Sequence, residues 1–333
     1  MPGKILAVAD LILPAVADDL IENAELVANA VPERGHFDRR ERVHVTRRES
    51  AQPAIAEAGL FFLRKNLVQI VAEPAHRFAR GANDLHQEAR NRGHALSVVG
   101  VPKTIDNDVG FVSRTFGFFT AVEEAVRVLD CAHTEARSVP GGIGLVKLMG
   151  RHAGFITAGA VVAGQDVNFA LVPEVPFKPD AFLAALKQRM LLKSHAVIAV
   201  AEGAGQDLLA ADASARDASG NVKLKDIGPF LREKIEAFFK AEGIPIVVRY
   251  FDPSYQVRSR PANSEDALLC DLFARHAVHA AMAGKTGVVI GFLHERFIHV
   301  PIELLATHTK RLDPASGWWH SVLAATGQPE RFA

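Results

Sequence analysis

From Gly81 onward, short apolar segments alternate with longer segments of helical spacing. Residues 95–100 (ALSVVG), 143–150 (IGLVKLMG) and 196–205 (AVIAVAEGAG) are apolar and end at or near glycine, as buried parallel strands do. Residues 116–136 place apolar side chains at helical spacing, and 154–164 (GFITAGAVVAG) have a helical composition with small residues. The alternation predicts an α/β fold, doubly wound, with mostly parallel sheets in two Rossmann-like lobes.

Polar loops follow three of these predicted strands, at residues 101–110, 150–152 and 202–206. In a doubly wound sheet, ligands bind beyond the carboxyl ends of the strands. We therefore expect these three loops to line a common site.

Residues 1–80 have a different pattern. They contain three glycines, and arginines gather between Arg34 and Arg48. A solvated basic face or a disordered arm is the favoured interpretation; a nucleic-acid contact is the alternative, although no aromatic residues interleave the arginines. Residues 207–226 are polar and indicate a surface loop or a hairpin around Ser219–Gly220.

Composition narrows the class of protein. The chain has 333 residues, 49% of them hydrophobic, and a formal net charge of zero, so neither a nucleic acid nor a membrane is expected as partner. The two cysteines, Cys131 and Cys270, suit a reducing cytosol. Asp10 interrupts the apolar stretch at the start of the sequence, so a soluble protein is the favoured interpretation and a weak secretory signal is the alternative. We expect a cytoplasmic protein with an atypical segment at 1–80 and two lobes, at 81–180 and 181–333.

The stretch GVPKTIDNDV, residues 100–109, places Asp106 and Asp108 on either side of an asparagine after a predicted strand. One carboxylate could accept a hydroxyl proton while its neighbour supports a metal ion, as phosphoryl transfer requires. The alternative is a polar turn that caps the next helix.

Three further motifs carry candidate ligand-binding side chains. In LMGRHAGF, Arg151 follows a strand end and could stabilise charge on a transferred phosphoryl group; a surface salt bridge is the alternative. In VAEGAGQ, Glu202 suits a sugar hydroxyl, or a helix cap. In residues 249–267, Arg249, Tyr255 and Arg258 could bind one phosphate, or form a solvated basic loop.

Two histidine pairs raise the possibility of a metal site, His276 with His279 and His294 with His299. No carboxylate or thiolate spacing completes such a site, so surface or packing roles are favoured and the metal ligands stay unknown. The pair Trp318–Trp319 is expected to pack a C-terminal helix.

Six motifs in the same order resemble the phosphofructokinase family, in its longer branch that includes plant-type enzymes. They are PKTIDND, VKLMGRHAGF, VPEVPF, AEGAGQ, FDPSYQVRSRPAN and AVHAAMAGKTG, and the resemblance covers about residues 81–329. It implies phosphoryl transfer to the 1-hydroxyl of fructose 6-phosphate, with Mg²⁺ and with ATP favoured over pyrophosphate as donor. It also implies a homo-oligomer, because the family's phosphate site is completed across a subunit interface.

The resemblance also implies roles for residues of the motifs. Asp106 is the general base, Thr104 contacts the transferred phosphoryl group or the substrate, and Arg151 stabilises the transition state. The residues that it implies as contacts of the sugar phosphate are Met149, Gly150, Arg151, Glu202, Arg249, Tyr255 and Arg258. Lys103 and Asp108 are implied on the donor side, with Asp108 supporting the metal-phosphate environment. The resemblance thus implies that 81–180 form the donor and catalytic-base lobe and that 181–333 form the sugar-phosphate lobe with C-terminal helices.

The chain departs from the family pattern upstream of PKTIDND. The family carries two glycine-rich phosphate loops there, the second of which reads GGDG or GGDD and holds a metal-binding aspartate. At the second position this chain has VAEPAHRFARGA, residues 71–82. Because glycine turns let a donor's phosphates approach backbone amides, the departure leaves two alternatives open beside the enzyme: a catalytically impaired sugar-phosphate-binding homologue, or a product with an altered N-terminus.

Overall fold

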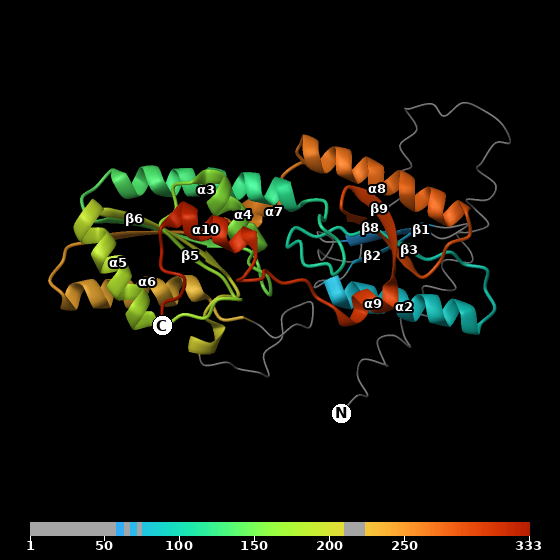
Figure 1. Ribbon diagram of the computed structural model, residues 1–333, viewed down its shortest axis with the longest axis horizontal. Helices are drawn as coiled ribbons and strands as arrows, with labels where there is room; N and C mark the ends of the chain where they lie inside the picture. Colours follow the sequence, from blue (N-terminus) through green and yellow to red (C-terminus); the bar gives the residue numbers. More distant parts are fainter. Residues whose placement is uncertain (1–57, 63–66, 72–74, 210–223) are drawn as a thin grey trace, which may run out of the picture.

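The computed structural model describes residues 58–62, 67–71, 75–209 and 224–333. They form an α/β fold of two lobes that lie side by side along the long axis of the molecule (Figure 1). One, the four-stranded lobe, has the strand order β5-β6-β4-β7; the other, the three-stranded lobe, has the order β3-β8-β9. No helix within the described ranges is long and apolar enough to cross a membrane.

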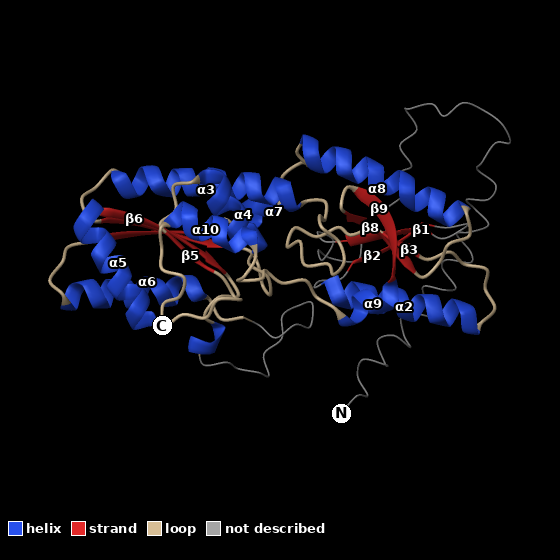
Figure 2. Ribbon diagram, in the orientation of Figure 1, coloured by secondary structure: helices blue, strands red, loops and turns tan. Residues whose placement is uncertain are grey.

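The four-stranded lobe is a parallel sheet covered by helices on both faces (Figure 2). In β6, Val197 and Ala199 pack into one apolar core with α3 and α4, whereas Ile198 and Val200 pack into a second core with α5 and α6. This alternation follows from the two-residue period of a strand. The elements are β4 (Gly142–Leu148), β5 (Phe169–Leu171), β6 (His195–Ala201), β7 (Val247–Phe251), α3 (Phe118–Arg137), α4 (Phe155–Gly164), α5 (Pro179–Lys193), η1 (Gln206–Leu208), α6 (Ile227–Ala241), α7 (Ser254–Arg258) and α10 (Gly317–Thr326).

The three-stranded lobe joins segments from both ends of the described chain. Strand β3 pairs in parallel with β8, and β8 pairs antiparallel with β9. Its elements are α2 (Ala75–Asn91), β3 (Val99–Gly100), α8 (Ser264–Met282), β8 (Val288–Leu293), β9 (Arg296–Pro301) and α9 (Ile302–Thr307); β1 (Ala58–Phe62) and β2 (Leu67–Val71) form an antiparallel hairpin. The expected lobes at 81–180 and 181–333 stay a prediction; the sheets themselves are built from segments that lie on both sides of residue 180.

Most predicted elements coincide with observed ones, and the differences have local causes. Helix α2 begins at Ala75, before the expected start at Gly81, and ends at Asn91. Of the predicted strand 95–100, only Val99–Gly100 pairs with β8, because the Val98 N–H bonds the Thr286 hydroxyl instead of a strand. The basic segment Arg34–Arg48 and the predicted hairpin around Ser219–Gly220 lie outside the described residues.

A buried carboxylate joins the two lobes where α3 and α8 begin. Asp266 Oδ2 accepts hydrogen bonds from Thr120 N at 2.7 Å and from Thr120 Oγ1 at 2.6 Å. Asn263 caps α8 by accepting a bond from Asp266 N at 2.9 Å, and its own N–H donates to Thr120 Oγ1. Asp266 thus compensates unpaired N–H groups at the start of α3 while it belongs to α8.

We expect Asp266→Ala to lower the free energy of unfolding by about 1.5–3 kcal/mol, since a hydrogen bond to a charged group contributes about that much. Denaturant unfolding followed by circular dichroism measures the change. Asp271→Ala is the matched control on the same helix, because Asp271 makes an exposed ion pair with Arg275. Equal losses in the two variants would contradict the role given to Asp266.

Candidate active site

The PKTIDND loop after β3 is held in one conformation by its own side chains. Asn107 is buried and has a φ of 53°, a left-handed conformation that asparagine tolerates better than most residues. Its Oδ1 accepts a bond from Thr115 N at 3.1 Å, and Thr115 Oγ1 donates to Thr104 O at 2.8 Å. Thr104 Oγ1 in turn accepts from Asp106 N at 3.1 Å, so the turn that carries Asp106 is hydrogen-bonded on both sides.

Lys310 ties this loop to the four-stranded lobe. Its ammonium donates to Val112 O at 2.7 Å and to Asn107 Oδ1 at 3.0 Å. It also lies 5.1 Å from the centre of the Phe155 ring, at the start of α4, within the range of a cation–π contact. Lys310 therefore brings the PKTIDND loop next to the loop that follows β4. No local motif indicates Lys310, because it lies about 200 positions from Asn107 and Val112 in the sequence.

Asp108 and Lys310 form a buried pair of opposite charge. Burial raises the pKa of Asp108 from its ordinary value of 3.8 to about 6, although its hydrogen bonds and Lys310 oppose the shift. Burial lowers the pKa of Lys310 to about 8, and the charge of Asp108 opposes that change. Each group thus compensates the other in a place where a lone charge would be costly.

The carboxylates of the PKTIDND loop do not form a complete magnesium site by themselves. Among the described residues, no group of three or more His, Cys, Asp or Glu side chains is placed to hold a metal ion. Asp108 is 3% exposed and the charge of Lys310 lowers its pKa, while its Oδ1 has no hydrogen-bond partner among the described residues. Because Mg²⁺ usually binds through one or two carboxylates together with the substrate's phosphates, we derive no step from a resident metal here.

The loops that follow β4 and β6 meet backbone to backbone. Glu202 N donates to Leu148 O at 2.9 Å, and Gly203 N donates to Gly150 O at 3.2 Å. Gly150 has a φ of 127°, and a side chain on Gly203 would collide with the Arg151 carbonyl. Only glycine fits both positions, so the glycines of LMGRH and AEGAG are what place Arg151 beside Glu202.

Glu202 lies at the centre of a charged group that includes three predicted site residues. Burial raises the pKa of Glu202, whereas the nearby charges of Arg151, Lys147 and Arg258 lower it. The three cations reach Glu202 from β4, from the loop after β4 and from α7. The structure therefore brings together Arg151, Glu202 and Arg258, which lie in three separate motifs of the sequence.

Tyr255 and Arg258 share the short helix α7. Tyr255 is 74% exposed, and the Arg258 guanidinium lies 5.1 Å from the centre of its ring. Arg249 is not brought to this group: it lies on β7, is exposed, and its Nε pairs with Glu135 Oε1 at 3.1 Å near the end of α3. A phosphate contact of Arg249 thus stays a prediction that a single chain does not support.

The other predicted positions lie along the same loops. Lys103 and Thr104 are half-buried, and Lys103 forms an isolated bridge with Phe116. Met149 packs against the core on the α3 and α4 face of the sheet, directly before Gly150. Of the histidines considered as metal ligands, His276 stacks on the Phe297 ring at 4.1 Å. Trp319 is buried in the core, and Trp318 contacts the rings of Phe118 and Phe155.

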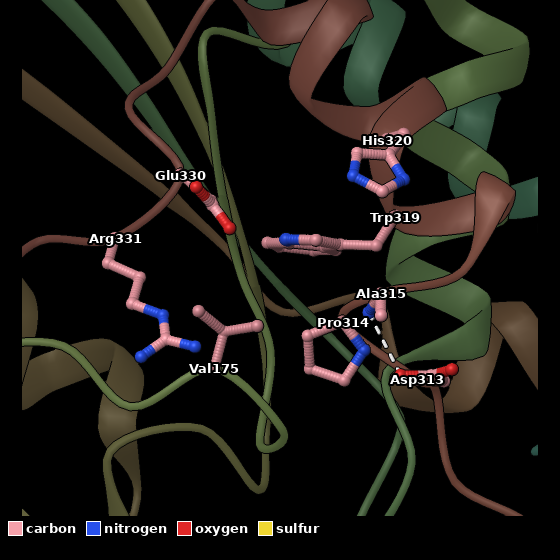
Figure 3. A pocket seen from close by; sticks show the side chains of 8 residues that line it. All are labelled: Val175, Asp313, Pro314, Ala315, Trp319, His320, Glu330 and Arg331. Atoms are coloured by element: carbon pink, nitrogen blue, oxygen red, sulfur yellow. Dashed lines mark hydrogen bonds between the residues drawn. The ribbon is translucent and has the colours of Figure 1, made fainter.

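A pocket of about 390 Å³ lies elsewhere, at the C-terminal segment (Figure 3). Its lining comes from the loop after β5, from the start of α10 and from the last residues of the chain: Val175, Asp313, Pro314, Ala315, Trp319, His320, Glu330 and Arg331. None of the predicted site residues lines it. We therefore place the candidate site at the charged group around Glu202, not at this pocket.

The Asp108 carboxyl predicts a pH effect on stability. Because its pKa is raised in the folded protein, the folded state binds more protons between pH 4 and pH 6 than the unfolded state does, and stability falls as pH rises. Relative to Asp108→Asn, wild type should lose up to about 3 kcal/mol of unfolding free energy over this window, at about 1.4 kcal/mol per pKa unit. Denaturant unfolding of both proteins from pH 4 to pH 7 measures it; a constant difference would contradict the raised pKa.

Comparison with known proteins identifies the family. The sequence model of the Phosphofructokinase family matches residues 64–281. The ATP-dependent 6-phosphofructokinase of Borreliella burgdorferi is 44% identical over 259 residues, which cover 75% of this chain and 58% of that protein. The corresponding enzyme of Trypanosoma brucei brucei is 47% identical over 250 residues, or 74% of this chain and 51% of that protein. The chain spans about half the length of the curated relatives it matches.

Solved structures agree on the fold. The pyrophosphate-dependent phosphofructokinase of Marinobacter aquaeolei has a TM-score of 0.60 and 21% identity over 76% of this chain and 65% of that one. That of Nitrosospira multiformis has a TM-score of 0.59 and 19% identity over the same shares. At these identities the likeness concerns the fold alone. The match to the family's sequence model over most of the described chain, together with the ordered motifs, shows that this chain belongs to the phosphofructokinase family.

Proposed function

We propose that the chain carries the site of a 6-phosphofructokinase, which transfers the terminal phosphoryl group of ATP to the 1-hydroxyl of fructose 6-phosphate and yields fructose 1,6-bisphosphate. The observation that carries the proposal is the convergence of Arg151, Glu202 and Arg258 at the ends of β4, β6 and α7. Two guanidinium groups suit a phosphate, and a carboxylate suits sugar hydroxyls. ATP is favoured over pyrophosphate because the relatives at 40–47% identity are named ATP-dependent.

The residues of the PKTIDND loop supply the base. Asp106 would accept the proton of the 1-hydroxyl while that oxygen attacks the terminal phosphorus and ADP leaves. Its backbone N–H is fixed by Thr104, so the carboxylate is held by the turn and not by a mobile loop. Arg151 would stabilise the charge that develops on the transferred group. Magnesium would enter with the donor's phosphates and neutralise part of their charge.

The donor half of the site is where this chain differs. Helix α2 already begins at Ala75, within the region where the family places its second glycine-rich loop. Residues 71–82 contain one glycine, Gly81, so few positions here let a donor's phosphates approach the backbone as closely as a glycine-rich loop does. The second candidate rests on this difference: a homologue that binds sugar phosphate with impaired catalysis, or a product with an altered N-terminus. The relatives named ATP-dependent 6-phosphofructokinase favour the first candidate.

The remaining assignments belong to the same proposal. We expect fructose 6-phosphate as ligand, a cytoplasmic location and a homo-oligomer, with neither a nucleic acid nor a membrane as partner. The exposed position of Arg249 fits the oligomer, because a side chain on the surface of one subunit is available to the site of another.

Arg258→Ala and Arg151→Ala should each weaken fructose 6-phosphate binding by about 1.5–3 kcal/mol, the usual size of a charge-assisted hydrogen bond. Isothermal titration calorimetry measures the affinity. Arg232→Ala serves as the control, since Arg232 pairs with Glu236 on the exposed side of α6. An unchanged affinity in Arg258→Ala would show that α7 does not hold the phosphate.

Turnover should lie far below the roughly 1–100 per second of ordinary kinases, because losing one preorganised contact already costs about a hundredfold or more. A coupled assay for fructose 1,6-bisphosphate, with ATP or pyrophosphate and magnesium, measures it for wild type and for Asp106→Asn. We also expect fructose 6-phosphate to bind more tightly than either donor. Ordinary turnover that disappears in Asp106→Asn would refute the impaired donor site and establish the full family reaction.

A further inference from the structure

Lys147 belongs to the charged group around Glu202, and none of the roles above involves it. It is the sixth residue of β4, two positions before Met149, and its side chain is 13% exposed. Its ammonium contacts Asp252 Oδ2 at 2.8 Å and both carboxylate oxygens of Asp226 at 3.1 Å. Burial lowers the pKa of Lys147, but the hydrogen bonds with Asp252 and Asp226 outweigh it and hold the pKa above its usual value.

Both aspartates belong to segments that frame the candidate site. Asp226 caps α6, where its Oδ1 accepts a bond from Gly228 N at 3.1 Å. Asp252 ends the β7 segment and its Oδ1 accepts from Ser254 N at 3.4 Å, at the first residue of α7. Lys147 therefore joins β4 to the start of the helix that carries Arg258.

The charges around Glu202 balance only when Lys147 is counted. The carboxylates are Glu202, Asp226 and Asp252, and the cations are Lys147, Arg151 and Arg258. Asp252 lies close enough to Glu202 to raise its pKa. Without Lys147, two partly exposed carboxylates would face the same region as the two arginines and would repel any phosphate that these bind.

We propose that Lys147 is a positioning residue of the phosphate site: by pairing with Asp226 and Asp252 and holding the start of α7, it offsets one of their two negative charges and so limits the repulsion of a phosphate monoester at Arg151 and Arg258. This inference rests on the proposed function, because it takes the ligand to be a sugar phosphate. A compact ammonium suits the position, since it satisfies carboxylates from α6 and β7 at once.

The test compares affinities for fructose 6-phosphate and for inorganic phosphate by calorimetry, on the full chain and below the unfolding temperature of every variant. Lys147→Met should weaken the binding of both ligands about tenfold, the effect of one unit charge on a nearby dianion at a partly solvated site. Lys147→Arg should retain most of the affinity. Lys187→Met is the matched control. Lys187 pairs with Glu242 at 2.6 Å, and neither residue belongs to these motifs.

A triple variant separates charge balance from simple structural support. Lys147→Met combined with Asp226→Asn and Asp252→Asn removes one positive and two negative charges. We expect it to bind at least about a third as tightly as wild type, a loss of less than about 0.7 kcal/mol. The triple variant also tests the role of Lys147 if Lys147→Met alone does not fold, since it leaves neither Asp226 nor Asp252 as an uncompensated carboxylate.

The outcomes distinguish this inference from the proposed function. Tight fructose 6-phosphate binding that Lys147→Met leaves unchanged, or a triple variant that fails to bind, would overturn the role of Lys147 only. Lys147-dependent binding of inorganic phosphate without binding of fructose 6-phosphate would support Lys147 and overturn the sugar assignment. A wild type that binds neither ligand would overturn both.

Discussion

The buried ammonium of Lys310 is the interaction on which the arrangement of the two lobes depends. An ammonium taken out of water must be surrounded by oxygen atoms, and here they come from Asn107 and Val112 of the loop after β3. The next residues of the same segment continue the connection, because Leu312 N donates to Glu174 Oε1, and Glu174 also accepts from Gly154 N. One short segment therefore fixes the PKTIDND loop against the loops of the four-stranded lobe.

A second constraint is the close approach of the loops after β4 and β6. Neighbouring parallel strands deliver their carboxyl ends to the same edge of a sheet, but side chains would normally keep the following loops apart. The glycines at 150 and 203 remove that obstacle, and the resulting hydrogen bond between them places Arg151 and Glu202 on adjacent turns. The candidate site is thus built from strand ends, which is how such a site holds its geometry without a ligand.

The chain follows the family's sequence pattern from the PKTIDND motif onward and departs from it upstream of that motif. The motifs from PKTIDND to AVHAAMAGKTG keep the family order, and the structure assembles several of them around Glu202. Upstream, helix α2 begins where a glycine-rich turn is expected. A phosphate cradle needs backbone N–H groups that a ligand can approach closely, and residues 71–82 contain one glycine, Gly81, for this purpose.

The sequence by itself determined the fold class, most helices and strands, and the identity of the residues at strand ends, because apolar periodicity and glycine positions are local properties. It also indicated Arg151, Glu202 and Arg258 through their motifs. Tertiary structure alone decided which of these meet: Arg258 joins Glu202, whereas Arg249, six residues before Tyr255, turns to Glu135. Lys147 and Lys310 were missed for the same reason. A lysine's partners here come from segments about 80 to 200 positions away, and only the packing of the sheets brings such charges within a few ångströms.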